Sequence, residues 1–111
     1  MMRVLVGLVV LVGACHNPMF DPAKEDTAVM TIKKLASSAF SEWGRAHPDK
    51  ACPDVIDELA QYVEGRVKDP WGHPYRMYCG ASLPAGIEAR FAVASDGPDG
   101  KQGTDDDVRS W

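Results

Sequence analysis

The sequence predicts an α+β fold in which one amphipathic helix packs on a small antiparallel sheet. Apolar residues recur every three or four positions from Ala28 to Trp43, which is the spacing of a helix with one buried face. Short segments rich in aromatic and alternating apolar residues follow Tyr75, as is typical of strands. The chain has 111 residues, enough for one small domain, and helices that precede strands indicate the α+β class.

The first fourteen residues predict a signal peptide. Met1-Met2-Arg3 is a short positive segment, and the apolar run Val4–Ala14 is too short to span a bilayer but suits the core of a signal. Small residues lead directly to Cys15, as in a bacterial lipobox, so we expect Cys15 to carry lipid and to become the N-terminus. The alternative is an ordinary secretory signal with an incidental cysteine. Both interpretations place the chain outside the cytoplasm.

Residues 15–23 are expected to be a tether, and residues 24–111 the folded domain. Asp21-Pro22 predicts a helix start, with Asp as the N-cap and Pro in the first helical position. Gly44, followed by Pro48, predicts its end. The expected buried stripe consists of Ala28, Val29, Ile32, Leu35, Ala36, Ala39, Phe40 and Trp43.

A shorter second helix is expected from Cys52-Pro53-Asp54 to Gly65, with an apolar face toward the core. That face would consist of Ile56, Leu59, Ala60 and Val63.

Two strands and the turns around them complete the predicted fold. Asp69–Tyr75 is a turn cluster, because Pro and Gly flank a Trp on both sides. Strands are predicted over Tyr75–Cys79 and Ile87–Ser95, separated by the loop Gly80–Gly86. On the second strand one face would carry Ile87, Ala89, Phe91 and Val93.

The charge and the polar residues argue against two classes of function. The formal net charge is −4 and no Lys/Arg cluster is present, so binding to nucleic acid is not expected. None of Ser82, Ser95 and Ser110 lies in a nucleophile-elbow sequence. We therefore expect no enzymatic activity and no small-molecule substrate.

The cysteines predict a disulfide. If Cys15 carries lipid, Cys52 and Cys79 remain as one pair, and thiols usually pair in an oxidising compartment. Such a bond would stabilise the domain by roughly 3.5 kcal/mol in the chain-entropy model. The alternative is a zinc site made by both cysteines with His47 and His73. Export and the lack of a short Cys-x-x-Cys motif favour the disulfide.

The C-terminal segment is rich in Asp and Gly. Its carboxylates would supply hard oxygen ligands, and its recurring glycines allow tight turns, as a calcium-binding loop requires. The alternative is a solvated acidic turn. The spacing does not match an EF-hand, and Mg²⁺ suits such a set less well. The five carboxylates are Asp96, Asp99, Asp105, Asp106 and Asp107.

Two motifs resemble the major (G-type) pseudopilin of type II secretion systems. Asp69-Pro-Trp-Gly-His-Pro-Tyr75 resembles the D-P-W-G-N-P-Y turn of that family, with His73 where Asn is usual. The segment from Phe91 to Trp111 is similar to the family's last strand and Asp/Gly calcium loop. The resemblance covers residues 24–111 and implies a pilin-like helix on a small sheet, with a loop ordered by Ca²⁺.

The resemblance also implies a set of calcium ligands. Carboxylates of Asp96, Asp105 and Asp107 carry over as ligands, and a backbone oxygen near Val93 is a further one. Asp99 and Asp106 match the family pattern less closely.

The N-terminus departs from that family. A pseudopilin begins with a prepilin-peptidase site and a long apolar helix, whereas this sequence begins with a lipobox-like signal. We therefore expect a lipoprotein anchored through Cys15 on the periplasmic side of the envelope, with secretion-system proteins as partners. His16, rather than Asp, follows Cys15 and favours the outer membrane. The alternatives are a filament-forming pseudopilin with an atypical or mis-assigned N-terminus and, from another class, a zinc-dependent enzyme.

Overall fold

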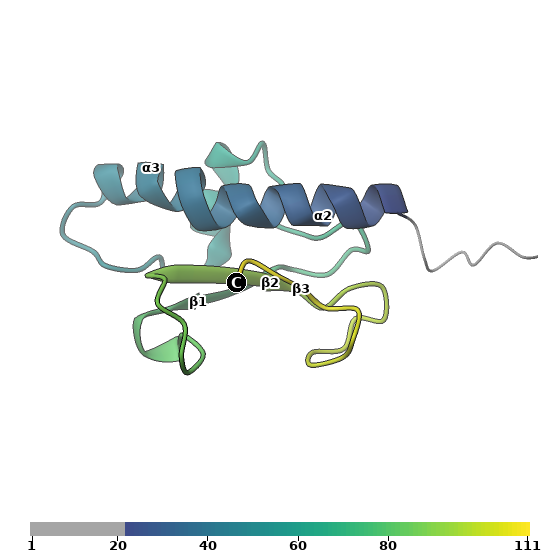
Figure 1. Cartoon of the computed structure of the whole chain (residues 1–111). Helices are drawn as coiled ribbons and strands as arrows, with labels where there is room; N and C mark the ends of the chain where they lie inside the picture. The colour runs from purple at the N-terminus through teal and green to yellow at the C-terminus, as the bar shows by residue number, and fades with distance from the viewer. Residues whose placement is uncertain (1–21) are drawn as a thin grey trace, which may run out of the picture.

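A computed structural model describes residues 22–111, in which one helical segment lies across a face of a three-stranded antiparallel sheet (Figure 1). This arrangement confirms the predicted α+β class. The signal peptide, Cys15, most of the tether and the Asp21 cap lie outside the described residues.

The helical segment begins near its predicted start and has an internal irregularity. It consists of α2 (Pro22–Lys34), a π-helical turn η1 (Leu35–Ala39) and α3 (Phe40–Ala46). The sequence did not predict the π-helical turn. The end predicted at Gly44 was wrong by two residues, because Gly44 keeps a helical conformation and the chain leaves the helix at His47.

One face of this helix supplies much of the core. Ile32, Leu35 and Trp43 are almost fully buried, as the spacing predicted, and the remaining positions of the stripe are buried or half-buried. Phe40 stacks on Phe91 of the sheet, with ring centroids 4.5 Å apart. The helix therefore attaches to the sheet through apolar packing, the dominant favourable term in folding.

The second helix, predicted from Cys52-Pro53-Asp54 to Gly65, is a shorter 3₁₀-helix, η2 (Ile56–Tyr62), because Val55 is extended and Val63 leaves the helix. Ile56, Leu59 and Val63 are buried as expected, whereas Ala60 is half-buried. Residues three apart eclipse one another in a 3₁₀-helix, so Ile56 and Leu59 share a face.

The sheet has the order β1-β2-β3 with antiparallel neighbours. Strands β1 (Arg76–Cys79) and β2 (Phe91–Ser95) pair over four positions, from Arg76 opposite Ala94 to Cys79 opposite Phe91. Strand β3 (Val108–Arg109) pairs with the end of β2.

Two details of the sheet differ from the prediction. The strand expected from Ile87 begins only at Phe91, and Ala89 is exposed. The turn η3 (Gly80–Ser82) leads the chain away after Cys79, so residues 87–90 face no pairing partner on β1. Strand β3 was not predicted, because two residues are too few to show an alternating pattern.

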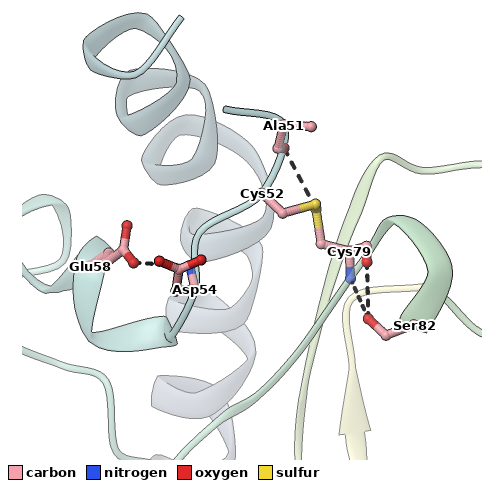
Figure 2. Close-up of a disulfide and its surroundings, with 6 residues drawn as sticks. All are labelled: Ala51, Cys52, Asp54, Glu58, Cys79 and Ser82. Atoms are coloured by element: carbon pink, nitrogen blue, oxygen red, sulfur yellow. Dashed lines mark hydrogen bonds between the residues drawn. A yellow bond between two sulfur atoms is a disulfide. The ribbon is translucent and has the colours of Figure 1, made fainter. Parts of the chain in front are cut away.

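The predicted disulfide joins Cys52 to Cys79, with their Cα atoms 6.0 Å apart. Figure 2 shows that it ties the segment before η2 to the end of β1. Ser82 lies beside it, and its hydroxyl accepts a hydrogen bond from the Cys79 backbone N–H at 2.8 Å. Because both sulfur atoms are bonded to each other, the zinc site proposed as an alternative is wrong.

Among residues 22–111, no helix has both the length and the apolar character needed to cross a bilayer.

A candidate metal-binding loop at the end of the sheet

The turn Asp69–Tyr75 is held by one buried carboxylate. Asp69 Oδ1 accepts hydrogen bonds from the backbone N–H groups of Trp71 and His73, at 3.1 and 2.8 Å. The Asp69 N–H donates to the His73 carbonyl at 2.7 Å. Asx-type bonds of this kind explain why Asp is suited to the first position of a tight turn.

The same carboxylate connects the turn to the strand that precedes the loop. Asp69 Oδ2 accepts a 2.7 Å hydrogen bond from the fully buried Ser95 hydroxyl. Ser95 Oγ in turn accepts the backbone N–H of Gly97 at 3.0 Å. Asp69 and Ser95 therefore position the first residues of the Asp/Gly loop.

Two glycines allow the loop to pack closely on its surroundings. Gly97 has φ +76°, and a Cβ there would lie 2.3 Å from the backbone oxygen of Asp106. Gly100 has φ +68°, and a Cβ there would lie 2.9 Å from the His73 ring. Both positions therefore require glycine on conformational and steric grounds. The second contact also places the loop directly on the turn.

Three carboxylates meet within the loop. Asp99, Asp106 and Asp107 each offer an oxygen, and the three oxygens lie within 4.8 Å of one another. Asp99 is exposed, and the other two are half-buried. Hard oxygen donors at this separation are the chemistry that Ca²⁺ requires, so the residues fit a calcium ion.

Hydrogen bonds from the loop itself hold these carboxylates in place. Asp99 N–H donates to Asp106 Oδ2 at 3.1 Å, and Gly103 N–H donates to Asp107 Oδ2 at 2.7 Å. The Thr104 hydroxyl lies 2.6 Å from Asp106 Oδ1. The Lys101 backbone N–H, 2.9 Å from Asp99 Oδ1, lowers the pKa of Asp99. This bond therefore favours the charged form of Asp99, which is the form that binds a cation.

The sequence-based ligand set and this cluster share Asp107 and Asp99. Asp106, which the resemblance ranked lower, belongs to the cluster, whereas Asp105 is exposed and is not part of it. The Val93 carbonyl, the backbone ligand expected from the resemblance, accepts a hydrogen bond from the backbone N–H of Ser110 at 2.9 Å.

Asp96 lies apart from the three clustered carboxylates and makes an ion pair. Arg76 Nε donates to Asp96 Oδ1 at 2.8 Å, and Arg76 Nη2 donates to Asp96 Oδ2 at 2.9 Å. The Asp96 carboxylate raises the pKa of Arg76 further above its ordinary value. Sequence reasoning missed Arg76 because a single Arg on a strand gives no local signal, and its partner is twenty positions away.

A shallow pocket of about 450 Å³ lies beside this ion pair. Its wall includes Tyr78 and the terminal Trp111, whose rings meet edge to face with centroids 5.7 Å apart. The Arg109 guanidinium lies 5.8 Å from the centroid of the Trp111 ring. Gln102 of the loop donates to the Tyr78 hydroxyl at 3.2 Å, so the loop also contacts this face of the sheet.

The fold and the loop define a pilin-like α+β domain with an acidic, glycine-rich C-terminal loop. The family model for type II secretion system (T2SS) protein G matches residues 46–111, which is more than half of the chain. The chain therefore belongs to the type II secretion protein G family, as the turn and loop motifs predicted. The match includes η2, the turn, the sheet and the loop.

Curated relatives support this assignment. Type II secretion system core protein G of Aeromonas hydrophila is 40% identical over 50 residues, which cover 45% of this chain and 32% of that protein. The core protein G of Klebsiella pneumoniae is 26% identical over 110 residues, covering 98% of this chain and 68% of that protein. That of Escherichia coli K12 is 34% identical over 50 residues, or 31% of its length. No solved structure shows significant similarity to the chain.

Proposed function

We propose that this protein is an envelope lipoprotein whose protein G domain has a structural or accessory role in type II secretion, with a C-terminal loop ordered by Ca²⁺. The observation that carries the proposal is the meeting of three carboxylates within 4.8 Å. They lie in a loop anchored to the sheet, within the residues that match the family.

The role of the metal is structural in this proposal. Asp99, Asp106 and Asp107 would hold the ion, which would neutralise carboxylates that otherwise repel one another. The Asp69–Ser95–Gly97 hydrogen bonds fix the start of the loop. The Tyr78–Gln102 bond holds a later part of it against the sheet. No catalytic group is needed for this function.

The anchor and the partners are also part of the proposal. Lipid on Cys15 would hold the domain on the periplasmic side of the envelope. His16, rather than Asp, follows this cysteine, and this favours the outer membrane. Type II secretion proteins are the proposed partners, because the relatives carry that system's name.

A filament-forming pseudopilin is the second candidate. One observation favours it: the alignment with the Klebsiella pneumoniae protein covers 98% of this chain, and so includes most of the N-terminal segment. Mass spectrometry of the mature N-terminus separates the two candidates. A diacylated Cys15 supports the lipoprotein, whereas a processed, unlipidated N-terminus supports the filament subunit. In the lipoprotein, Cys15→Ala abolishes fatty-acid labelling.

Calcium binding is tested by thermal unfolding of the full chain with Ca²⁺ and with EDTA. A ligand that binds only the folded state raises the melting temperature by mass action. We expect Asp106→Asn to reduce this rise strongly and Asp105→Asn, at the neighbouring exposed position, to reduce it less. An identical melting temperature with and without Ca²⁺ for the unsubstituted protein contradicts the calcium proposal.

A further inference from the structure

Arg76 and Asp96 form a two-pronged ion pair at the base of the loop. Arg76 begins β1 and Asp96 directly follows β2, and the two N–H···O distances are 2.8 and 2.9 Å. The Asp96 side chain is 9% exposed, while that of Arg76 is 42% exposed. Both carboxylate oxygens of Asp96 therefore already accept a hydrogen bond from a cationic group.

Arg76 also shares a pocket with one member of the carboxylate cluster, Asp107. Arg76, Asp96 and Asp107 line the same pocket. The negative charge of Asp107 is one of the influences that raise the pKa of Arg76, after the larger effect of Asp96. An Arg guanidinium is not deprotonated in proteins, so a permanent positive charge lies near both Asp96 and Asp107.

We propose that Arg76 sets the calcium affinity of the loop, by withdrawing Asp96 from the metal and leaving Asp99, Asp106 and Asp107 as its ligands. This inference rests on the calcium-binding part of the proposed function. It assigns a role to a residue outside the loop, and it predicts an unusual result: removing a positively charged side chain from the sheet improves the binding of a cation to the loop.

The physical reason is competition for one carboxylate. Ca²⁺ gains affinity with each charged oxygen ligand, and Asp96 cannot serve both cations without losing its paired geometry. A calcium ion near Asp107 is also repelled by the Arg76 charge. Because Arg76 is partly exposed, solvent and salt reduce this repulsion. We therefore expect a moderate change in affinity.

The test is isothermal titration of the full chain with CaCl₂ at constant ionic strength. We expect Arg76→Gln to bind Ca²⁺ on the order of tenfold more tightly than the unsubstituted protein. Arg76→Lys keeps the charge but not the two-pronged hydrogen bonds, so its affinity should rise less than that of Arg76→Gln. Adding Asp96→Asn to Arg76→Gln should remove most of the gain, because the released carboxylate is its main source.

Arg109→Gln is the matched control for net charge. Arg109 lies in the same cross-strand row as Arg76, since both are opposite Ala94, but it contacts the ring of Trp111. We expect this variant to change calcium affinity by less than about threefold. Circular dichroism verifies that each variant is folded. If Arg76→Gln does not fold, Arg76→Met, which keeps the apolar stem, takes its place.

The outcomes separate this inference from the calcium proposal. Binding by the unsubstituted protein with no gain in Arg76→Gln overturns the role of Arg76 and leaves calcium binding intact. Binding by Arg76→Gln alone supports the role of Arg76 and contradicts calcium binding by the unsubstituted loop. If neither protein binds, both ideas are wrong. An equal gain in Arg109→Gln also overturns the inference, because net charge would then explain it.

Discussion

Ser95 donates its hydroxyl hydrogen to Asp69 across 26 positions of sequence, at a distance of 2.7 Å in the buried interior. This bond joins the turn before the sheet to the strand before the loop. Because Asp69 also accepts two backbone N–H groups of its own turn, the two family motifs share one carboxylate.

Ser95→Ala should therefore destabilise the domain. The change removes a buried hydrogen bond to a carboxylate and leaves the Gly97 N–H without its acceptor. We expect a loss of about 1.5–3 kcal/mol in the free energy of unfolding, measured by urea denaturation. Ser41→Ala is the control, because Ser41 is exposed on the helix. A loss in Ser95→Ala no larger than that of the control would contradict this role.

Gly97→Ala should disrupt the start of the loop. The new Cβ would meet the Asp106 backbone oxygen at 2.3 Å, in addition to the strain of φ +76°. We expect a loss of roughly 2–4 kcal/mol. Gly103→Ala is a matched control: φ there is +83°, but nothing lies within 4 Å of the added Cβ. That variant should lose only about 1–2 kcal/mol, and equal losses would rule out the steric contact as the cause.

Glu58 should make part of the stability depend on pH. Its carboxylate accepts the Asp54 N–H at 2.9 Å and the Trp43 indole N–H at 3.0 Å. These bonds lower the pKa of Glu58 in the folded state, and the bond from the Asp54 backbone has the largest effect. A lowered folded pKa adds stability above the unfolded pKa, and this stability is lost as the pH falls through the folded pKa.

Glu58→Gln tests this dependence. The difference in the free energy of unfolding between the original protein and the variant should be largest near neutral pH. It should shrink below about pH 4, where the unfolded carboxyl is protonated. Asp57→Asn, at the exposed neighbouring position, is the control. If the stability difference stays constant from neutral to acidic pH, the two hydrogen bonds stabilise the fold equally whether Glu58 is charged or neutral, and the prediction is wrong.

Removing the disulfide should cost about 3.5 kcal/mol of unfolding free energy. The double variant Cys52→Ser with Cys79→Ser opens the connection between the segment before η2 and β1. Dithiothreitol should lower the stability of the original protein by a similar amount and leave the double variant unchanged. If the reductant destabilises both proteins equally, its effect does not come from this bond.

The helix and its buried stripe could be predicted from the sequence because their signal is local. Spacings of three and four from Ala28 to Trp43 identify the buried face without knowledge of the sheet. The helix contains a π-helical turn at Leu35–Ala39. No residue type in that segment predicts this turn. The two-residue strand β3 depends on pairing with Ala94 and Ser95, which is a long-range interaction.

The loop could be located from sequence, but its internal arrangement could not. The glycines and carboxylates predict a metal-binding type of turn, and the disulfide was predicted by counting cysteines in a chain expected to be exported. Which carboxylates meet depends on backbone turns at Gly97, Gly100 and Gly103. It also depends on Arg76, which reaches Asp96 from another strand.

The contact between Phe40 and Phe91 bears on whether the helix can be replaced by one from another protein. Stacked rings and an apolar stripe hold the helix on the sheet, and such contacts specify shape more than chemical identity. The family match begins at residue 46, where α3 ends, and the disulfide lies wholly within the matched segment. We therefore expect that a helix of foreign origin with the same apolar stripe packs on this sheet, and chimeras joined near residue 46 test this expectation.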